Sequence, residues 1–107
     1  MDKVYNEELC QWEYRPVGDI DIQNSNEIKK EILGDFSEKE GDILIDGKDL
    51  EYIDSTGLGA IIAIYKEVND RGKKIIFTNL AKFVHKLFKI TDMDKLFEIR
   101  GVENGED

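Results

Sequence analysis

The residues with the most chemical potential in this chain are residues 54–57, which read Asp-Ser-Thr-Gly. An apolar run at residues 43–45 precedes them and a longer one at residues 58–65 follows, which predicts a buried strand and then a helix. The hydroxyls would therefore lie at a helix N-terminus, where unpaired N–H groups and the helix dipole favour an anion. In that place Ser55 can cap the helix through its side-chain oxygen, and a phosphate on Ser55 would find a favourable environment.

Two glycines, Gly57 and Gly59, fall in the first turn of the predicted helix. Without a β-carbon they allow another backbone or a bulky group to approach that turn closely. Each interior glycine costs about 1 kcal/mol of helix stability relative to alanine. We therefore expect that close approach matters more than helix strength at this point of the chain.

The helix after Ser55 has two different sides when its residues are placed 100° apart. The side predicted to face the sheet carries Leu58, Ile61, Ile62, Tyr65 and Asn69. The opposite side, flanked by Gly59 and Ile64, would be exposed, and it carries Thr56, Ala60, Ala63 and Glu67. This shallow, mildly apolar surface could receive another domain. The alternative is that alanine is present only because it is the best helix former.

Residues 45–58, I-D-G-K-D-L-E-Y-I-D-S-T-G-L, resemble the bacterial anti-sigma factor antagonists, which are single-domain members of the STAS group. The resemblance covers about residues 12–100 and includes the turn at residues 17–21. In that family the anti-sigma factor, a kinase, phosphorylates the serine that directly follows the aspartate. The resemblance thus implies Ser55 as the phosphorylated residue, and it places near that serine Asp21, Asp54, Thr56 and Gly57.

The resemblance also implies partners and a mechanism. The expected partners are an anti-sigma factor with a histidine-kinase-like ATPase fold and serine kinase activity, and a serine phosphatase. The unphosphorylated chain would bind the anti-sigma factor and release the sigma factor, and phosphorylation of Ser55 would switch binding off. The docking surface would consist of Thr56, Gly59, Ala60, Ala63 and Glu67. The alternative function is that of a STAS regulatory subunit in a membrane transporter or a stress-signalling complex.

Length and pattern predict one α/β domain over residues 1–107, with its core at about residues 11–100 and an acidic tail at residues 103–107. The predicted strands are residues 11–17, 43–45 and 74–78, with weaker ones at 4–9 and 96–100. The predicted helices are residues 24–36, 56–70 and 81–89, with a turn at 18–19 and a loop at 47–54. This alternation predicts a mixed sheet of four to five strands, parallel pairs with right-handed crossovers, and helices mainly on one face.

The charge balance limits the classes of partner. With 24 acidic and 15 basic residues the net charge is −9, so the surface repels nucleic acids and anionic membranes, and we expect it to bind neither directly. No apolar run approaches the 18 residues of a spanning helix and no leader is present, which predicts a cytoplasmic protein. The high charge and the lack of a long apolar stripe favour a monomer.

Enzymatic and metal-binding interpretations fit the residues poorly, and we expect neither activity nor a cofactor. A serine hydrolase needs glycine two residues before its nucleophile, where this chain has Ile53. Residues 54–57 carry one residue too many for an aspartic protease motif, and no Gly-Lys-Ser/Thr loop is present. The single histidine, His85, falls on a polar helix stripe with Lys82, Lys86 and Lys89.

A zinc site has no ligand set, because the chain has one cysteine and one histidine. Cys10 is expected to be a small, partly buried hydrophobic residue. Two interpretations remain open for the acidic groups near Ser55, which include Asp21, Asp49 and Glu51. They could hold a Mg²⁺ ion that a kinase brings with its nucleotide, or they could be ordinary turn and capping residues.

Overall fold

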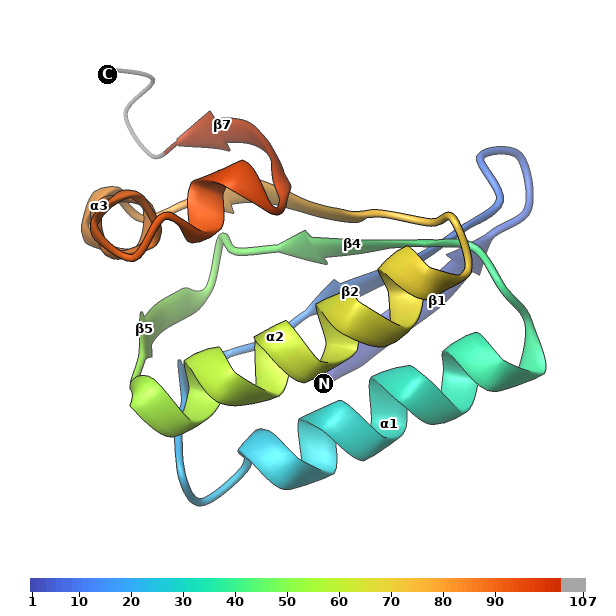
Figure 1. Cartoon of the computed structure of the whole chain (residues 1–107), viewed down its shortest axis with the longest axis horizontal. Helices are drawn as coiled ribbons and strands as arrows, with labels where there is room; N and C mark the ends of the chain where they lie inside the picture. Colours follow the sequence, from blue (N-terminus) through green and yellow to red (C-terminus); the bar gives the residue numbers. More distant parts are fainter. Residues whose placement is uncertain (103–107) are drawn as a thin grey trace.

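The computed structural model describes residues 1–102, so the predicted acidic tail at residues 103–107 lies outside the described residues. Strands and helices alternate over most of this length (Figure 1). The strands are β1 Asp2–Asn6, β2 Gln11–Arg15, β3 Gly18–Ile20, β4 Asp42–Asp46, β5 Leu50–Ile53, β6 Ile75–Leu80 and β7 Glu98–Val102. The helices are α1 Ser25–Glu38, α2 Ser55–Asp70 and α3 Lys82–Ile90, with a 3-10 turn at Met93–Lys95.

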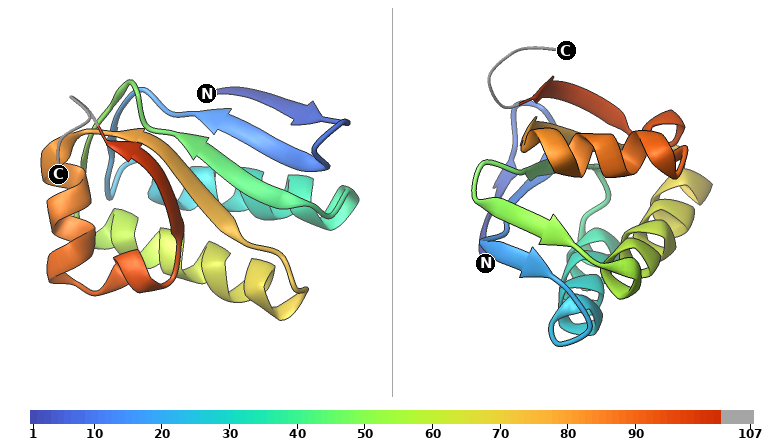
Figure 2. Two further views of the ribbon diagram at one scale, coloured as in Figure 1. Left: turned by 90° about the horizontal axis from the view of Figure 1, so that it is seen from above. Right: turned by 90° about the vertical axis from the view of Figure 1, so that its left-hand side faces the viewer.

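Five strands form the main sheet in the order β1-β2-β4-β6-β7, with β1 and β7 at its edges (Figure 2, left). The strands from β2 to β7 pair in parallel, as the alternation of apolar runs with helical periods predicts, and only β1 pairs antiparallel with β2. The predicted mixed sheet of four to five strands is therefore confirmed.

A second sheet of two strands, β3 and β5, lies beside the main one (Figure 2, right). The predictions for both segments were wrong, because residues 47–54 were expected to be a loop and Gly18-Asp19 a turn. The sequence Leu50-Glu51-Tyr52-Ile53 buries only its two ends, so it lacks the strict alternation that marks a strand. Gly18, at a φ of +82°, makes the bend into β3 that glycine tolerates.

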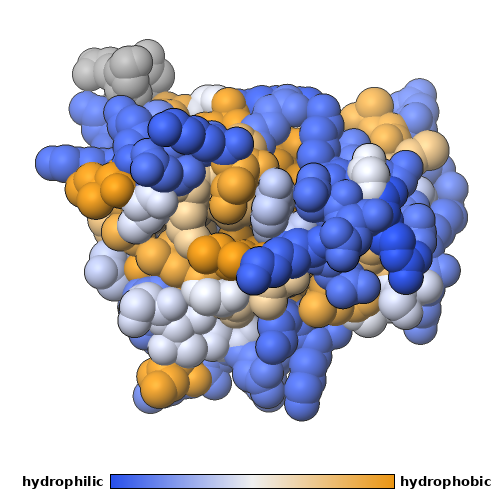
Figure 3. Space-filling model, viewed as in Figure 1, coloured by the Kyte–Doolittle hydropathy of each residue, from blue (hydrophilic) through white to orange (hydrophobic). Residues whose placement is uncertain are grey.

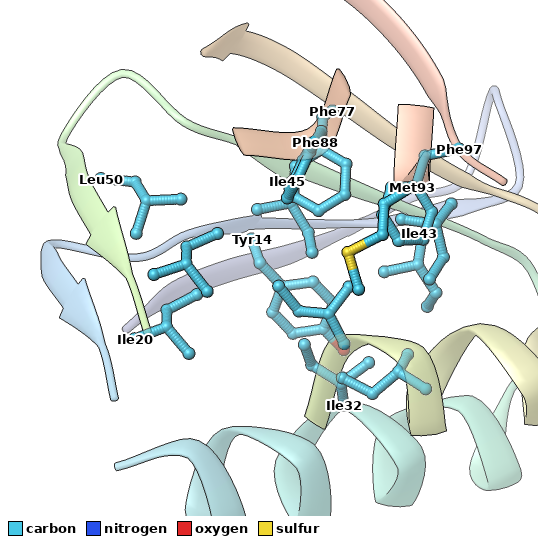
Figure 4. Packing of buried hydrophobic residues seen from close by; sticks show 14 of the residues in the cluster. Tyr14, Ile20, Ile32, Ile43, Ile45, Leu50, Phe77, Phe88, Met93 and Phe97 are labelled. Carbon is cyan, nitrogen blue, oxygen red and sulfur yellow. The ribbon is translucent and has the colours of Figure 1, made fainter. Parts of the chain in front are cut away.

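The hydrophobic core lies between the main sheet and the helices on one of its faces. Helices α1 and α2 run side by side under this face, and α3 packs at its end, where the Phe88 ring lies 5.0 Å from that of Phe77. Figure 4 shows Ile20 of β3 and Leu50 of β5 pointing into the same core. The small sheet is therefore anchored to the core, although it does not pair with the main sheet.

The first and last strands are displaced from the predicted ranges. The first strand begins at Asp2 and ends at Asn6, and residues 7–10 form a turn in which the Asn6 side chain accepts from the Leu9 amide. This turn places Cys10 at a φ of +54° and leaves it exposed, so the prediction that Cys10 is partly buried was wrong. The last strand starts two residues late because the 3-10 turn and Phe97, which is in the core, precede it.

No helix within residues 1–102 combines the length and the apolar character that crossing a membrane would require.

Candidate functional site

The start of α2 is built by Asp54, which joins β5 to the helix. Its backbone is extended, and its carboxylate oxygen Oδ1 accepts a hydrogen bond from the Gly57 amide at 2.8 Å. Asp54 is thus the N-cap, and the prediction that Ser55 caps the helix was wrong. Both residue types are strong caps, so the sequence did not decide between them. Ser55 is instead the first helical residue.

Ser55 is exposed, and within residues 1–102 its hydroxyl has no hydrogen-bond partner. The neighbouring Thr56 is exposed as well. The side chain of Asp54 therefore already caps the helix terminus, and the Ser55 hydroxyl is not used in a hydrogen bond within the described residues. A hydroxyl in this situation is accessible to an enzyme that transfers a group to it, at the end of a helix that favours negative charge.

The two glycines in the first turn of α2 have different roles. A β-carbon on the buried Gly57 would lie 2.4 Å from the Ile20 carbonyl oxygen and 2.9 Å from the Ile53 side chain. The predicted close approach is therefore real at Gly57, and the backbone that approaches is that of β3. At Gly59, by contrast, a β-carbon would meet no atom within 4 Å, so the packing of this chain does not require a glycine there.

A turn at residues 21–24 lies next to the start of α2. The second carboxylate oxygen of Asp54 accepts from the Ile22 amide at 3.2 Å, and the Asp54 amide donates to the Ile20 carbonyl at 3.1 Å. Asp21 shapes this turn, because its own carboxylate accepts from the Gln23 amide at 3.0 Å. The structure therefore gives both aspartates a local hydrogen-bonding role.

The acidic residues of this region do not gather around one point. Within the described residues, no three side chains of the metal-binding types converge on a common position. Asp49 and Glu51 are exposed, and Asp49 contributes its backbone carbonyl to the Gly18 amide of the small sheet. The structure shows turn or cap geometry for Asp21, Asp49 and Asp54, whereas Glu51 lies within strand β5.

The buried face of α2 differs from the predicted one. It consists of Gly57, Ile61, Ile64 and Val68. Ile64, expected beside the exposed surface, is 1% exposed, whereas Asn69, expected to face the sheet, is exposed. The reason is that α2 contacts α1 as well as the sheet, which shifts the buried stripe toward α1.

The side predicted for docking remains accessible. Thr56, Gly59 and Glu67 are exposed, whereas Ala60 and Ala63 are half-buried. These residues lie at helical spacing on one side of α2, and Ser55 adjoins its N-terminal end. Figure 3 shows that the neighbouring surface between α2 and α3 is more hydrophobic than the rest of this face. The arrangement forms one continuous candidate surface on the side of α2 for which the sequence predicts docking.

An aromatic pair near this site was not predicted. Tyr52 of β5 stacks on Phe83 of α3 with ring centroids 5.8 Å apart, and the two are 46% and 50% exposed. Phe83 is exposed on α3, whereas Val84 and Phe88 of the same helix are buried. The contact of Phe83 with Tyr52 could not be predicted from the sequence, because it depends on strand β5, which was predicted to be a loop.

The basic stripe of α3 lies apart from Ser55. Its three lysines are exposed and His85 is half-buried, and with Val102 they line a shallow cleft. This agrees with the predicted polar face of the helix.

Comparisons with known proteins address the same region. The chain matches the sequence profile of the STAS domain over residues 7–104. An anti-sigma-B factor antagonist of Listeria monocytogenes is 34% identical over 87 residues, which cover 80% of this chain and 75% of that protein. A crystal structure from Thermotoga maritima, described as a candidate anti-sigma factor antagonist, superposes with a TM-score of 0.85 at 21% identity, over 92% of this chain and 84% of that one.

The phosphorylated form of the Bacillus cell fate determinant SpoIIAA superposes with a TM-score of 0.68 at 18% identity, over 85% of this chain and 83% of that one. At these identities the solved structures show the shared fold. The profile match spans most of the chain, and the chain therefore belongs to the STAS domain family. Within that family, it is similar over four fifths of its length to an anti-sigma-B factor antagonist.

Proposed function

We propose that this protein is an anti-sigma factor antagonist whose binding is switched off by phosphorylation of Ser55. The observation that carries the proposal is an exposed serine hydroxyl without an internal hydrogen bond, at the first residue of a helix capped by the preceding aspartate. The similarity to a curated anti-sigma-B factor antagonist supports the antagonist function over that of a transporter subunit. It also supports a regulatory rather than a catalytic role.

The proposed docking surface is the exposed side of α2, with Ser55 at its end and Thr56, Gly59, Ala60, Ala63 and Glu67 along it. In the unphosphorylated protein this surface packs against the anti-sigma factor, which then releases its sigma factor. Gly59 supports this proposal, because the chain itself leaves the space above it empty. A partner that packs closely against the helix would use that space.

Phosphorylation changes the charge at this surface. A phosphate adds about −1.5 to −2 charges and three acceptor oxygens, to a chain whose net charge is already −9. In the free protein the helix N-terminus and water accommodate the group. In the complex the group must be desolvated, and a loss of about 3 kcal/mol lowers affinity more than a hundredfold. The switch therefore requires no change of fold.

The finer parts of the proposal concern the partners. The anti-sigma factor has a histidine-kinase-like ATPase fold and is itself the serine kinase, and a serine phosphatase restores the free hydroxyl. The antagonist acts in the cytoplasm as a monomer, since its surface charge opposes self-association.

The direct test measures binding of Ser55 variants to an anti-sigma factor from the same genome. We expect Ser55→Ala to bind as tightly as the unmodified protein and to stay bound in the presence of ATP. Ser55→Asp should bind at least about tenfold more weakly, a loss of about 1.4 kcal/mol. Ser37→Ala is the matched control, because Ser37 is an exposed serine on α1.

Mass spectrometry after incubation with ATP and the anti-sigma factor should place the added phosphate on Ser55. Phosphate on Thr56 or on Ser37 alone, or equal affinity of the alanine and aspartate variants, would contradict the proposal.

A further inference from the structure

The carboxylate of Asp54 makes two hydrogen bonds that point in different directions. One oxygen holds the Gly57 amide inside α2 at 2.8 Å, and the other holds the Ile22 amide of the neighbouring turn at 3.2 Å. The backbone of Asp54 also donates to the Ile20 carbonyl. Asp54 is thus the connection between the first turn of the Ser55 helix and the turn at residues 21–24.

That turn is strongly shaped by its own side chains. Asn24 donates to the Asp19 carbonyl at 2.7 Å and accepts from the Asp21 amide at 2.9 Å, and Asp21 accepts from the Gln23 amide. The side-chain hydrogen bonds of Asn24 are therefore made within the turn. Asn24 makes no capping hydrogen bond to α1, although it occupies the N-cap position of that helix.

The ordered turn presents an apolar side chain to solvent. Ile22 is 74% exposed, the highest value among the large hydrophobic residues of the described chain. In Figure 3 a small hydrophobic area at the lower left lies over the turn before α1, separate from the band between α2 and α3. Exposed isoleucines are common singly. Here, however, several polar contacts fix the position of one, next to the serine of the proposed switch.

We propose that Asp54 is a positioning residue that couples the phosphorylation state of Ser55 to the Ile22 turn, and that Ile22 is a contact for the anti-sigma factor. This inference rests on the proposed function and adds a second element to its regulation. Unphosphorylated, the Asp54 carboxylate holds the turn in place for binding. Phosphorylated, Ser55 carries a dianion directly beside that carboxylate, and the repulsion displaces it from its longer hydrogen bond, the one to Ile22.

The direction of this effect follows from the two bonds. The bond to Gly57 closes the first turn of the helix and is the shorter one, so the carboxylate keeps it. The bond to Ile22 crosses between two elements and lies at an exposed position, where a small movement breaks it. Phosphorylation then acts on the partner twice, through the added charge and through the released turn.

The coupling can be measured without any partner. Phosphoserine is placed at position 55 by genetic encoding, and hydrogen exchange of the Ile22 amide is followed by NMR. We expect exchange to become about threefold faster or more, because the amide loses its acceptor. Asp54→Asn should give the same acceleration without phosphate, since its single acceptor oxygen serves as the helix cap. In Asp54→Asn, phosphoserine should then cause no further acceleration, which is the non-additivity expected of one shared contact.

Unchanged exchange at Ile22 after phosphorylation overturns the coupling. Additive effects of phosphoserine and Asp54→Asn overturn it as well, because a merely structural aspartate would give them. Protection of the α2 amides in the same spectra shows whether Asp54→Asn still caps the helix.

The contact is tested by binding to the anti-sigma factor. Ile22→Ser should lower affinity at least about tenfold, and Ile90→Ser should leave it unchanged. Ile90 is the matched control, since it is an equally exposed isoleucine at 71% on α3. If Ser55 variants change binding and Ile22→Ser does not, the contact is wrong while the proposed function stands. If no variant or wild-type chain binds any anti-sigma factor, the proposed function fails, and the exchange result still decides the coupling.

Discussion

Gly57 and Gly59 lie two residues apart in the same helical turn, and the structure separates their roles. Gly57 is required by the fold, because the Ile20 carbonyl of β3 occupies the space a side chain would need. Gly59 has free space above it, so no contact within the chain compensates for the helix stability that this glycine costs. The sequence predicted close approach at both glycines, but it could not show which approach was internal.

Replacement of Gly59 tests whether a partner uses that space. Gly59→Ala should stabilise the free protein by about 0.5 to 1 kcal/mol, because alanine is the better helix former. It should also weaken binding to the anti-sigma factor, because the added methyl group occupies the partner's space. Urea unfolding and binding titration measure the two effects.

Gly34→Ala is the matched control, since Gly34 is an exposed glycine inside α1 where an added β-carbon would meet no atom within 4 Å. It should stabilise to a similar extent and leave binding unchanged. Equal binding by both variants would argue against close packing on this side of α2.

At the scale of elements, the helices and the long strands could be predicted and the small sheet could not. Ile43 and Ile45 lie in a β-branched run, and Ile61, Ile64 and Val68 follow a helical period, so these elements are visible in the sequence. Strand β5 buries only Leu50 and Ile53, and its pairing with β3 is a long-range contact that no local pattern encodes.

The candidate site shows the same division between local and tertiary information. The position of Ser55 at the start of a helix follows from the sequence around it, and the structure agrees. The identity of the cap did not follow, because Asp54 and Ser55 are both suitable residues. The orientation of α2 did not follow either, since it depends on the packing of α1 beside it.

The close packing of α2 against β3 allows a prediction about the stability of the fold. Gly57→Ala places a methyl group 2.4 Å from the Ile20 carbonyl oxygen, so the two elements must move apart. We expect a loss of about 1 to 3 kcal/mol in the free energy of unfolding, as for other overpacked sites. Thermal unfolding checks this, and an unchanged or raised melting temperature would show that the junction is loose.

At the scale of the whole molecule, Asp46 connects three adjacent strands of the main sheet. It ends β4, accepts from Asn79 of β6 at 3.1 Å, and pairs with Arg15 of β2 at 3.3 Å. Burial alone would raise its pKa, but the hydrogen bonds from Asn79 and the Lys48 amide and the charge of Arg15 outweigh it and hold the pKa below its usual value of 3.8.

The sign of this shift gives a pH dependence. A carboxylate with a lowered pKa in the folded state stabilises the fold above pH 3.8, and the stabilisation is lost as the pH falls through the lower, folded value. Asp46→Asn should therefore cost about 1 kcal/mol near neutral pH, and the difference from wild type should shrink as the pH falls below 3.8. Urea unfolding at several pH values measures it. Asp70→Asn is the control, because it removes an exposed carboxylate at the end of α2 and leaves the contacts of Asp46 intact.

The free Ser55 oxygen has a consequence for descent within the family. Since Asp54 closes the helix and no other described group depends on the serine, replacing Ser55 costs the scaffold almost nothing. Under the proposed function, a duplicated gene could lose the modification in a single mutational step and still encode the same fold, which would give a permanently active copy. Under the proposed function, selection would maintain this serine for regulation and not for the stability of the fold.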